Sequence, residues 1–301
     1  MTRLPTAELM RRALAQGTAI PAFNIPYLPM MAPVVRALAD TKTCGLIAVA
    51  LLEFTKFESG SPAAIRDEYE RVKDEAVTRL HMDHVPVIDE DNLRVDYLAV
   101  LREAVALGYE SIMVDGSRLD LAENIACTRA VVEMAHAHNV PVEAELGAIL
   151  GHEAGPLPPY EELFASGRGF TDVGEAVRFV QETGVDWLSI AIGNIHGAIS
   201  AAGKAKQKVA ARLDIDQLGR LREATGIPLV LHGGTGIQRD YIQAAIANGI
   251  AKINVATAIR QPYEALKDQS IERAQQAVYE ATCELVADEL AVTGNAVRLM
   301  A

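Results

Sequence analysis

The sequence predicts a (β/α)8 barrel, an α/β fold in which helices cover eight parallel strands, with extra helices near the C-terminus. Eight short apolar runs alternate with stretches in which apolar residues recur every three or four positions, as strands and helices do in such folds. Polar residues follow nearly every apolar run, and in barrels the ends of the strands form the active face. The chain has 301 residues. We therefore expect a single barrel domain over residues 1–301, with a helical extension over about 261–301.

The predicted elements follow one another in a regular order. The predicted strands lie at 20–24, 45–51, 78–82, 110–115, 140–145, 186–192, 228–232 and 250–254. The predicted helices lie at 30–39, 95–107, 121–138, 174–183, 214–225 and 239–248. Several helices end at a glycine before the next strand, where a left-handed backbone closes a helix: Gly108, Gly184, Gly226 and Gly249. A doubly wound sheet shares this alternation and is the alternative to a barrel.

Composition limits the classes of function. The formal net charge of −12 argues against a nucleic-acid-binding or anionic-membrane surface. No apolar run approaches the roughly 20 residues that a membrane span needs, and residues 1–17 have the pattern of an amphipathic helix rather than of a signal peptide. Cys44, Cys127 and Cys283 form no CxxC pair, as expected of reduced thiols. We expect a cytoplasmic protein without nucleic-acid or membrane partners.

Three of the seven histidines follow different predicted strands: His84, His196 and His232. Each alone could be a structural histidine. Three neutral imidazoles that converge on one point make a catalytic zinc site with an open position for substrate. Their shared placement at the active face favours a metal site. His136 and His138 lie within a predicted helix and are given no role, and His81 is left open.

A glycine-rich segment after the seventh strand predicts a phosphate site. The run from His232 to Gly236 offers exposed backbone N–H groups just before a predicted helix. Barrels often bind phosphate after strands 7 and 8, and Asn254 and Thr257 follow strand 8. Residues 198–212 are rich in Ala and Lys. They form either a solvated helix or loop, or a mobile loop that supplies a cation to an anionic substrate.

These motifs together resemble the class II aldolases, the zinc-dependent fructose-bisphosphate and tagatose-bisphosphate type, over roughly residues 5–260. The matching segments are PAFN at 21–24, HMDH at 81–84, VDGSRLDLAENI at 114–125, VEAELG at 142–147, FTD at 170–172, AIGNIHG at 191–197, LVLHGGTGI at 229–237 and KINVAT at 252–257. The resemblance implies reversible aldol cleavage of a ketose (bis)phosphate to dihydroxyacetone phosphate and an aldehyde, through a zinc-stabilised enediolate.

The resemblance also implies a role for each matching residue. His84, His196 and His232 hold one zinc ion per subunit, with Glu145 as an accessory carboxylate. Asp83 is the acid/base for the aldehyde-derived hydroxyl, and Glu153 moves the proton on the carbon beside the carbonyl. The alternatives without a catalytic role are that Asp83 only orients a histidine and that Glu153 is an exposed loop residue. The substrate-binding residues are Asn24, Gly197, Gly233, Thr235, Asn254 and Thr257.

The family resemblance extends to ions and assembly. Backbone carbonyls near Gly197 and Gly233 hold a monovalent cation in some members, so a Na⁺ or K⁺ site is a further expectation. The helical C-terminal region and the resemblance together favour a homodimer or homotetramer. The predicted partner is therefore a phosphorylated sugar, together with further copies of the chain.

The sequence departs from the family pattern at the aldehyde end of the site. Leu51, Leu52 and Glu53 occupy the end of strand 2, where members usually carry a small hydroxyl residue and glycine. Val85-Pro86 follows the HMDH motif, and Arg118 replaces a common histidine. The segment after Gly197 is longer than usual and lacks the common Tyr-Lys. The acceptor aldehyde is therefore predicted to differ from glyceraldehyde 3-phosphate: a smaller or uncharged aldehyde, or one with another anion.

Two other functions compete with the aldolase hypothesis. A metal-dependent sugar-phosphate isomerase or epimerase would use the same metal but return the proton without breaking a carbon–carbon bond. A non-catalytic binding protein predicts that some of the histidines or acids are lost, and none is. Release of a triose phosphate separates an aldolase from both.

Overall fold

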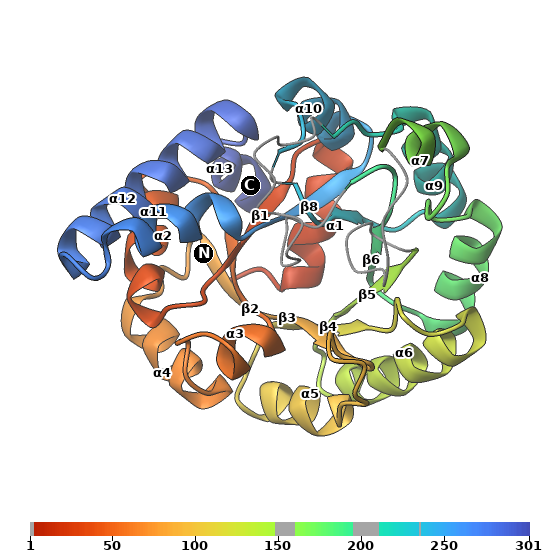
Figure 1. Ribbon diagram of the computed structural model, residues 1–301, viewed down its shortest axis with the longest axis horizontal. Coiled ribbons are helices and arrows are strands. Elements are labelled where there is room, and N and C mark those ends of the chain that lie inside the picture. Colours follow the sequence, from red (N-terminus) through yellow and green to blue (C-terminus); the bar gives the residue numbers. More distant parts are fainter. Residues whose placement is uncertain (1–2, 148–159, 195–210, 235) are drawn as a thin grey trace.

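The computed structural model describes residues 3–147, 160–194, 211–234 and 236–301. Eight parallel strands form a closed barrel in which each strand pairs with the next and β8 pairs with β1. This confirms the predicted (β/α)8 architecture (Figure 1). The strands are β1 (Ile20–Asn24), β2 (Gly45–Val49), β3 (Thr78–Pro86), β4 (Ser111–Asp115), β5 (Val142–Leu146), β6 (Trp187–Ile190), β7 (Leu229–Leu231) and β8 (Ile250–Val255).

Helices surround the barrel (Figure 1). The six helices predicted between strands are all present, and residues 51–55, 62–72 and 160–166 form further helices that the sequence analysis does not predict. Those before β5 are α1 (Thr6–Gln16), η1 (Leu28–Met30), α2 (Met31–Asp40), α3 (Leu51–Thr55), α4 (Pro62–Val72), α5 (Tyr97–Ala106) and α6 (Leu121–His136). The later ones are α7 (Tyr160–Ser166), α8 (Val173–Thr183), α9 (Ile215–Thr225), α10 (Arg239–Ala247), α11 (Thr257–Leu266), α12 (Ile271–Glu284), the π-helical turn η3 (Leu285–Glu289) and α13 (Asn295–Met300).

Local sequence signals explain where several helices begin and end. Four helices begin at an aspartate whose carboxylate accepts a hydrogen bond from the backbone N–H three residues later, which satisfies an otherwise unpaired donor: Asp96, Asp120, Asp172 and Asp214. The four glycines predicted to separate helix from strand all have positive φ. The capping aspartates and the glycines thus fix where these helices begin and end, and so the lengths of the loops between helices and strands.

Several strands differ from the prediction at their carboxyl ends, and the differences at β2 and β3 affect the site. The strand predicted at 45–51 ends at Val49, and residues 51–55 form the helix α3. The Glu53 carboxylate accepts a 2.8 Å hydrogen bond from the Ala50 N–H, which starts this helix. The strand predicted at 78–82 continues to Pro86, and its pairing with β4 shifts register between Met82 and Val85.

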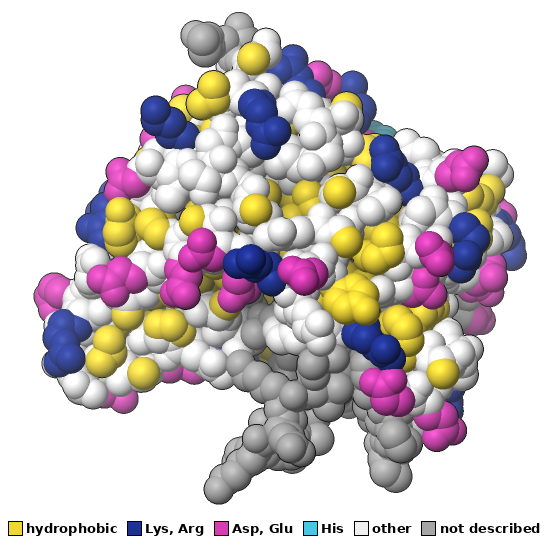
Figure 2. Space-filling model, turned by 90° about the horizontal axis from the view of Figure 1, so that it is seen from above, with side chains coloured by type: hydrophobic (Ala, Val, Ile, Leu, Met, Phe, Trp, Pro, Cys, Tyr) yellow, Lys and Arg dark blue, Asp and Glu magenta, His cyan; other side chains and the backbone are white. Residues whose placement is uncertain are grey.

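The C-terminal helices lie outside the barrel, where α12 packs against α2, α11 against α12 and α13 against α1; Figure 1 shows α11 and α12 beside α2. The helical extension predicted from about 261 begins earlier, because α11 starts at Thr257 directly after β8. Among the described residues, no helix is long and apolar enough to cross a membrane. The face seen in Figure 2 intersperses acidic and basic side chains among apolar and neutral ones rather than grouping them by sign.

Candidate active site

Buried polar side chains collect at the carboxyl ends of five barrel strands. Six of them are at most 5% exposed: Asn24 on β1, Asp83 on β3, Glu143 and Glu145 on β5, His232 after β7, and Lys252 on β8. Side chains alternate along a strand, so Glu143 and Glu145 share one face of β5. The same spacing places Lys252 and Asn254 on one face of β8. An interior filled with charges is unfavourable unless the charges pair, and these do.

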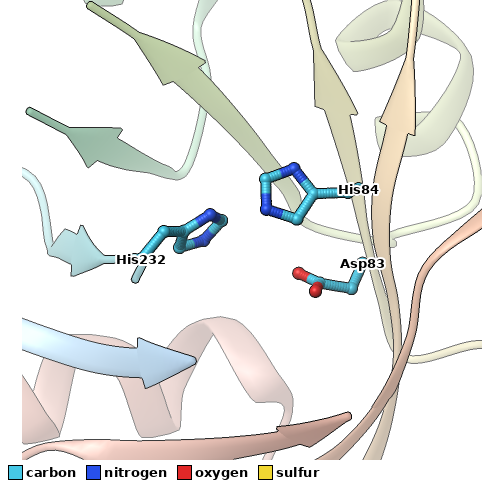
Figure 3. A group of neighbouring side chains, drawn as sticks. All are labelled: Asp83, His84 and His232. Atoms are coloured by element: carbon cyan, nitrogen blue, oxygen red, sulfur yellow. The ribbon is translucent and has the colours of Figure 1, made fainter. Parts of the chain in front are cut away.

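Asp83, His84 and His232 point into one space (Figure 3). One potential ligand atom from each of the three lies within 4.8 Å of the others. The rings of His84 and His232 have centroids 4.4 Å apart. Regular alternation along β3 would place the Asp83 and His84 side chains on opposite faces. The pairing of β3 with β4 shifts register between Met82 and Val85, the stretch that contains both residues, and here both side chains point to the same space.

A carboxylate holds one nitrogen of each histidine. The Nδ1 of His84 lies 3.2 Å from Asp115 Oδ2, and the Nε2 of His232 lies 2.8 Å from Glu143 Oε1. Metal-binding histidines commonly have such a carboxylate partner, which fixes the ring and its tautomer. Glu145 lies 3.2 Å from the Nδ1 of His232. Two imidazoles and adjacent carboxylates form a donor set that suits a divalent transition metal such as zinc.

The electrostatics of this group favour a positive charge. Burial acts against protonation of His84, but the charges of Asp83, Glu145 and Asp115, with the Asp115 hydrogen bond, outweigh it and raise its pKa to about 10. Burial and the His84 charge oppose protonation of His232, yet Glu143 and Glu145 raise its pKa. A site that attracts a proton this strongly also attracts a metal cation, so the residues present fit a bound metal.

Asp83 is a buried carboxylate held from three sides. The Nδ2 of Asn24 donates to its Oδ2 at 2.9 Å, and the Nδ2 of Asn254 lies 3.0 Å from both of its oxygens. Lys252 Nζ lies 3.6 Å from Oδ1. Burial disfavours the charged form, but Lys252 and His84 outweigh it, so the pKa of Asp83 lies well below its ordinary value.

Lys252 is the buried cation behind the site. Its ammonium donates to Glu143 and to the side-chain oxygen of Asn254, at 3.0 and 2.6 Å. Glu143 also accepts a 2.6 Å hydrogen bond from Trp187 Nε1. Burial opposes ionisation of Glu143, but the charges of Lys252 and His232, with the His232 hydrogen bond, outweigh it and lower the pKa of Glu143 to about 2. Glu143 therefore stays ionised and able to orient His232.

A pocket of about 670 Å³ opens over this group. At one end it is lined by Gly233 and Asn254 with Thr257, and at the other by residues that follow β2, β3 and β4. His84, Asp83 and Glu145 line its middle. The described residues predicted for the site thus line one pocket, except His232, which is fully buried beside it. Glu153, His196, Gly197 and Thr235 lie outside the described residues, and so does most of the basic segment 198–212.

Sequence reasoning missed three groups that the structure places here. Lys252 and Glu143 belong to matched motifs but were given no role, although their spacing by two from Asn254 and Glu145 was a readable signal. The sequence analysis treats Glu53 only as a departure from the family pattern. The structure places its carboxyl group in the pocket wall, where the residue is 7% exposed.

His81, whose role the sequence leaves open, is fully buried. Its Nδ1 lies 2.9 Å from Ser111 Oγ and its Nε2 lies 3.5 Å from Asp83.

The chain matches the family model of class II fructose-bisphosphate aldolases over residues 4–296. It belongs to that family of lyases. Its structure is similar to that of the YdjI aldolase from Escherichia coli K12, with a TM-score of 0.74 and 26% identity over 97% of this chain and 99% of that one.

Two further solved structures resemble it. A protein from Coccidioides immitis, described as a candidate fructose-1,6-biphosphate aldolase, is 26% identical over 97% of this chain and 98% of that chain, with a TM-score of 0.76. The fructose-bisphosphate aldolase from Campylobacter jejuni is 19% identical over 96% and 95% of the two chains, with a TM-score of 0.72, and supports the fold alone.

Proposed function

We propose that the protein is a zinc-dependent aldolase that reversibly cleaves a ketose phosphate into dihydroxyacetone phosphate and an aldehyde. The observation that carries the proposal is the convergence of Asp83, His84 and His232 at the pocket of a class II aldolase barrel, whose wall Asp83 and His84 line. The carboxylate partner of each histidine supports a metal site, since the same arrangement orients metal ligands in other proteins.

His84 and His232 would hold the metal together with His196, and Glu145 would be an accessory ligand. When bound, the metal supplies Lewis-acid stabilisation of the negative charge that develops on the ketose oxygens. Asp115 and Glu143 fix the two described rings, so the histidines need little reorganisation to bind an ion. A monovalent cation beside Gly197 and Gly233 belongs to the same proposal.

Asp83 would move the proton at the bond that breaks. In the cleavage direction it accepts the proton of the hydroxyl on the aldehyde side, while the electrons of the carbon–carbon bond remain with the dihydroxyacetone phosphate half. Glu153 would deliver a proton to the carbon left beside the carbonyl. The charges of Lys252 and His84 keep Asp83 ionised, and the amide donors of Asn24 and Asn254 hold it in position for this task. A positioned acid/base of this kind contributes roughly 10² to 10⁴ in rate.

The phosphate of the ketose would bind at the end of the pocket formed after β7 and β8. Gly233 lines this end, and Thr257 is the first residue of α11, whose N-terminal N–H groups attract anions. Asn24, Gly197, Thr235 and Asn254 complete the proposed set of substrate-binding residues. The acceptor aldehyde would occupy the opposite end, beyond Asp83. We expect it to differ from glyceraldehyde 3-phosphate, because the residues after β2 depart from the family pattern.

A substrate panel tests this function. The zinc-loaded protein is incubated with ketose 1-phosphates and ketose 1,6-bisphosphates, and release of dihydroxyacetone phosphate is followed with and without a chelator. Chelator-sensitive release from at least one ketose is expected. Isomerisation or epimerisation of a sugar phosphate without triose phosphate release would instead favour the alternative enzyme class.

A further inference from the structure

The acceptor end of the pocket has an apolar part in its wall, beside polar and charged residues. Helix α3, the segment that follows it and the residues after β3 contribute Leu51, Leu52, Phe57 and Ile88 to this part. This is the part of the site where the chain departs from its family. Hydrophobic walls bind an uncharged group better than a doubly charged phosphate, which would lose hydration on entering.

Three cations line the same pocket, and each already has partners. The ammonium of Lys56 lies 2.5 Å from Glu90 and 2.8 Å from Asp91. Arg118 donates to the Asp89 carbonyl at 2.8 Å and to the Asn92 side chain at 3.3 Å.

Arg260, the third of these cations, makes two 2.8 Å hydrogen bonds with the carboxylate of Glu264. Within the part of the chain that the structure describes, two of the three cations of the pocket, Lys56 and Arg260, are therefore ion-paired, and Arg118 is hydrogen-bonded to neutral oxygens. A second phosphate would have to compete with these contacts.

Glu53 places a carboxyl group in this wall. Its Oε2 accepts from the Ala50 N–H at 2.8 Å and from Asn24 Nδ2 at 3.4 Å, and Asn24 also donates to Asp83. No described residue hydrogen-bonds to the other oxygen, Oε1, although the side chain lines the pocket. Burial raises the pKa of Glu53 to about 8. At neutral pH the group is mainly a carboxylic acid, which can donate one hydrogen bond to a ligand and accept another.

We infer that the acceptor aldehyde is uncharged and that Glu53 is the residue that selects it, by hydrogen bonding to a hydroxyl of the aldehyde portion. This inference rests on the proposed aldolase function and deepens it by naming the substrate class. Glu53 favours an uncharged acceptor because its free oxygen suits a hydroxyl, while a neutral carboxylic acid offers no positive charge to a phosphate. The apolar neighbours and the existing partners of Lys56 and Arg260 act in the same direction.

Matched substrate pairs test the substrate class. The ratio of kcat/KM for a ketose 1-phosphate to that for the ketose 1,6-bisphosphate of the same stereochemistry is measured over several sugars. In the reverse direction, glyceraldehyde and glyceraldehyde 3-phosphate are compared as acceptors. We expect the uncharged partner to be favoured by about 100-fold or more for the best sugar. Equal or better use of the bisphosphate overturns the inference while leaving the aldolase intact. Failure of every substrate instead removes the proposed function.

Variants then test Glu53 itself. We expect Glu53→Ala to lower this ratio at least tenfold, mainly by reducing kcat/KM for the uncharged substrate, and Glu53→Gln to retain most of it, because an amide also donates and accepts. If the alanine variant does not fold, Glu53→Met replaces it at similar side-chain length. The control Glu58→Gln lies outside the pocket lining, at 70% side-chain exposure, and keeps the wild-type ratio. An unchanged ratio in the alanine or methionine variant contradicts the role of Glu53.

Discussion

At the scale of single residues, Asp83 links the metal group to the acid/base chemistry. The change Asp83→Asn keeps its shape but removes the charge and the basic oxygen. We expect kcat to fall by roughly 10² to 10⁴ while the zinc content stays at the wild-type level, since His84 and His232 remain. Steady-state kinetics and metal analysis of the same sample measure both. Loss of zinc together with activity would mean that Asp83 is chiefly a metal ligand.

Lys252 balances two buried carboxylates, Asp83 and Glu143. Lys252→Met removes the charge and leaves them without their buried cation, so we expect a loss of about 3–5 kcal/mol in the free energy of unfolding. Denaturant titration measures this loss. The control Lys73→Met removes a surface ion pair with Glu70 and Glu75, and should cost about 1 kcal/mol or less. Equal effects of the two changes would rule out a special role for Lys252.

Glu53 should leave a signature in the pH dependence of stability. Burial raises its folded pKa from an ordinary value near 4.5 to about 8, so between these values the folded state holds a proton that the unfolded state has lost. The resulting stabilisation is fully present below pH 4.5 and is lost as pH rises through 8. Nearby Asp83 adds to the shift and His84 opposes it.

Glu53→Gln removes this titration. The difference in unfolding free energy between wild type and variant should therefore shift against the wild type as pH rises from 5 to 8, by up to about 1.4 kcal/mol per pH unit. Denaturant unfolding at pH 5, 6.5 and 8 measures it, and effects of pH common to both proteins cancel. A difference that does not vary with pH would show that Glu53 is ionised throughout.

Site residues could be identified from the sequence where they belong to a sequence motif. They were harder to identify where their role depends on contacts between distant segments. The position after predicted strands indicated His84 and His232, and the family resemblance indicated Asp83. The sequence did not reveal that Glu143 and Lys252 form a buried pair, since their contact joins β5 to β8 across 109 positions. The effect of burial on Glu53 was likewise invisible, because desolvation depends on which side chains surround the group.

At the scale of elements, β4 and α6 support the site through a close contact. A Cβ added at Gly116 would lie 2.2 Å from Asn124 Oδ1, and Asn124 donates a 3.0 Å hydrogen bond to the Glu145 carbonyl. Gly116→Ala must therefore displace Asn124 and disturb the end of β5. We expect a loss of about 1–3 kcal/mol in stability and weaker zinc binding.

The matched control is Gly219→Ala on α9, where an added Cβ meets nothing within 4 Å. It should be neutral or stabilise the protein by about 0.5–1 kcal/mol, because alanine favours a helix more than glycine does. Thermal denaturation and zinc titration of both variants measure the contrast. Similar behaviour of the two would show that the space beside Gly116 does not matter.

The boundaries of helices and strands were predicted best where a capping residue begins a helix or a glycine ends one. They were predicted worst at the carboxyl ends of β2 and β3. The apolar side chains of Leu51 and Leu52 suggest a longer strand. Instead, α3 begins there, because the Glu53 carboxylate accepts a hydrogen bond from the Ala50 N–H. The register shift in β3 arises from pairing with β4, a contact between segments that no local pattern encodes.

At the scale of the whole molecule, the barrel brings the ends of distant strands to one pocket. The alternation of elements is shared by a barrel and a doubly wound sheet, and the β1–β8 pairing shows that the predicted barrel closes. The strand order places the proposed phosphate end, after β7 and β8, opposite the acceptor end, after β2 to β4. Substrate selection can therefore change at one end while the other keeps its chemistry.

The central claim is that one metal ion at His84 and His232 supports carbon–carbon bond cleavage. The most direct test removes the metal with a chelator, dialyses the protein and restores zinc stepwise, while release of dihydroxyacetone phosphate from the best ketose phosphate is followed. We predict negligible release without metal, and a rise that saturates at one zinc per chain in the wild type but is absent in His84→Ala and His232→Ala. Full activity in the stripped protein, or in both histidine variants, would contradict the claim.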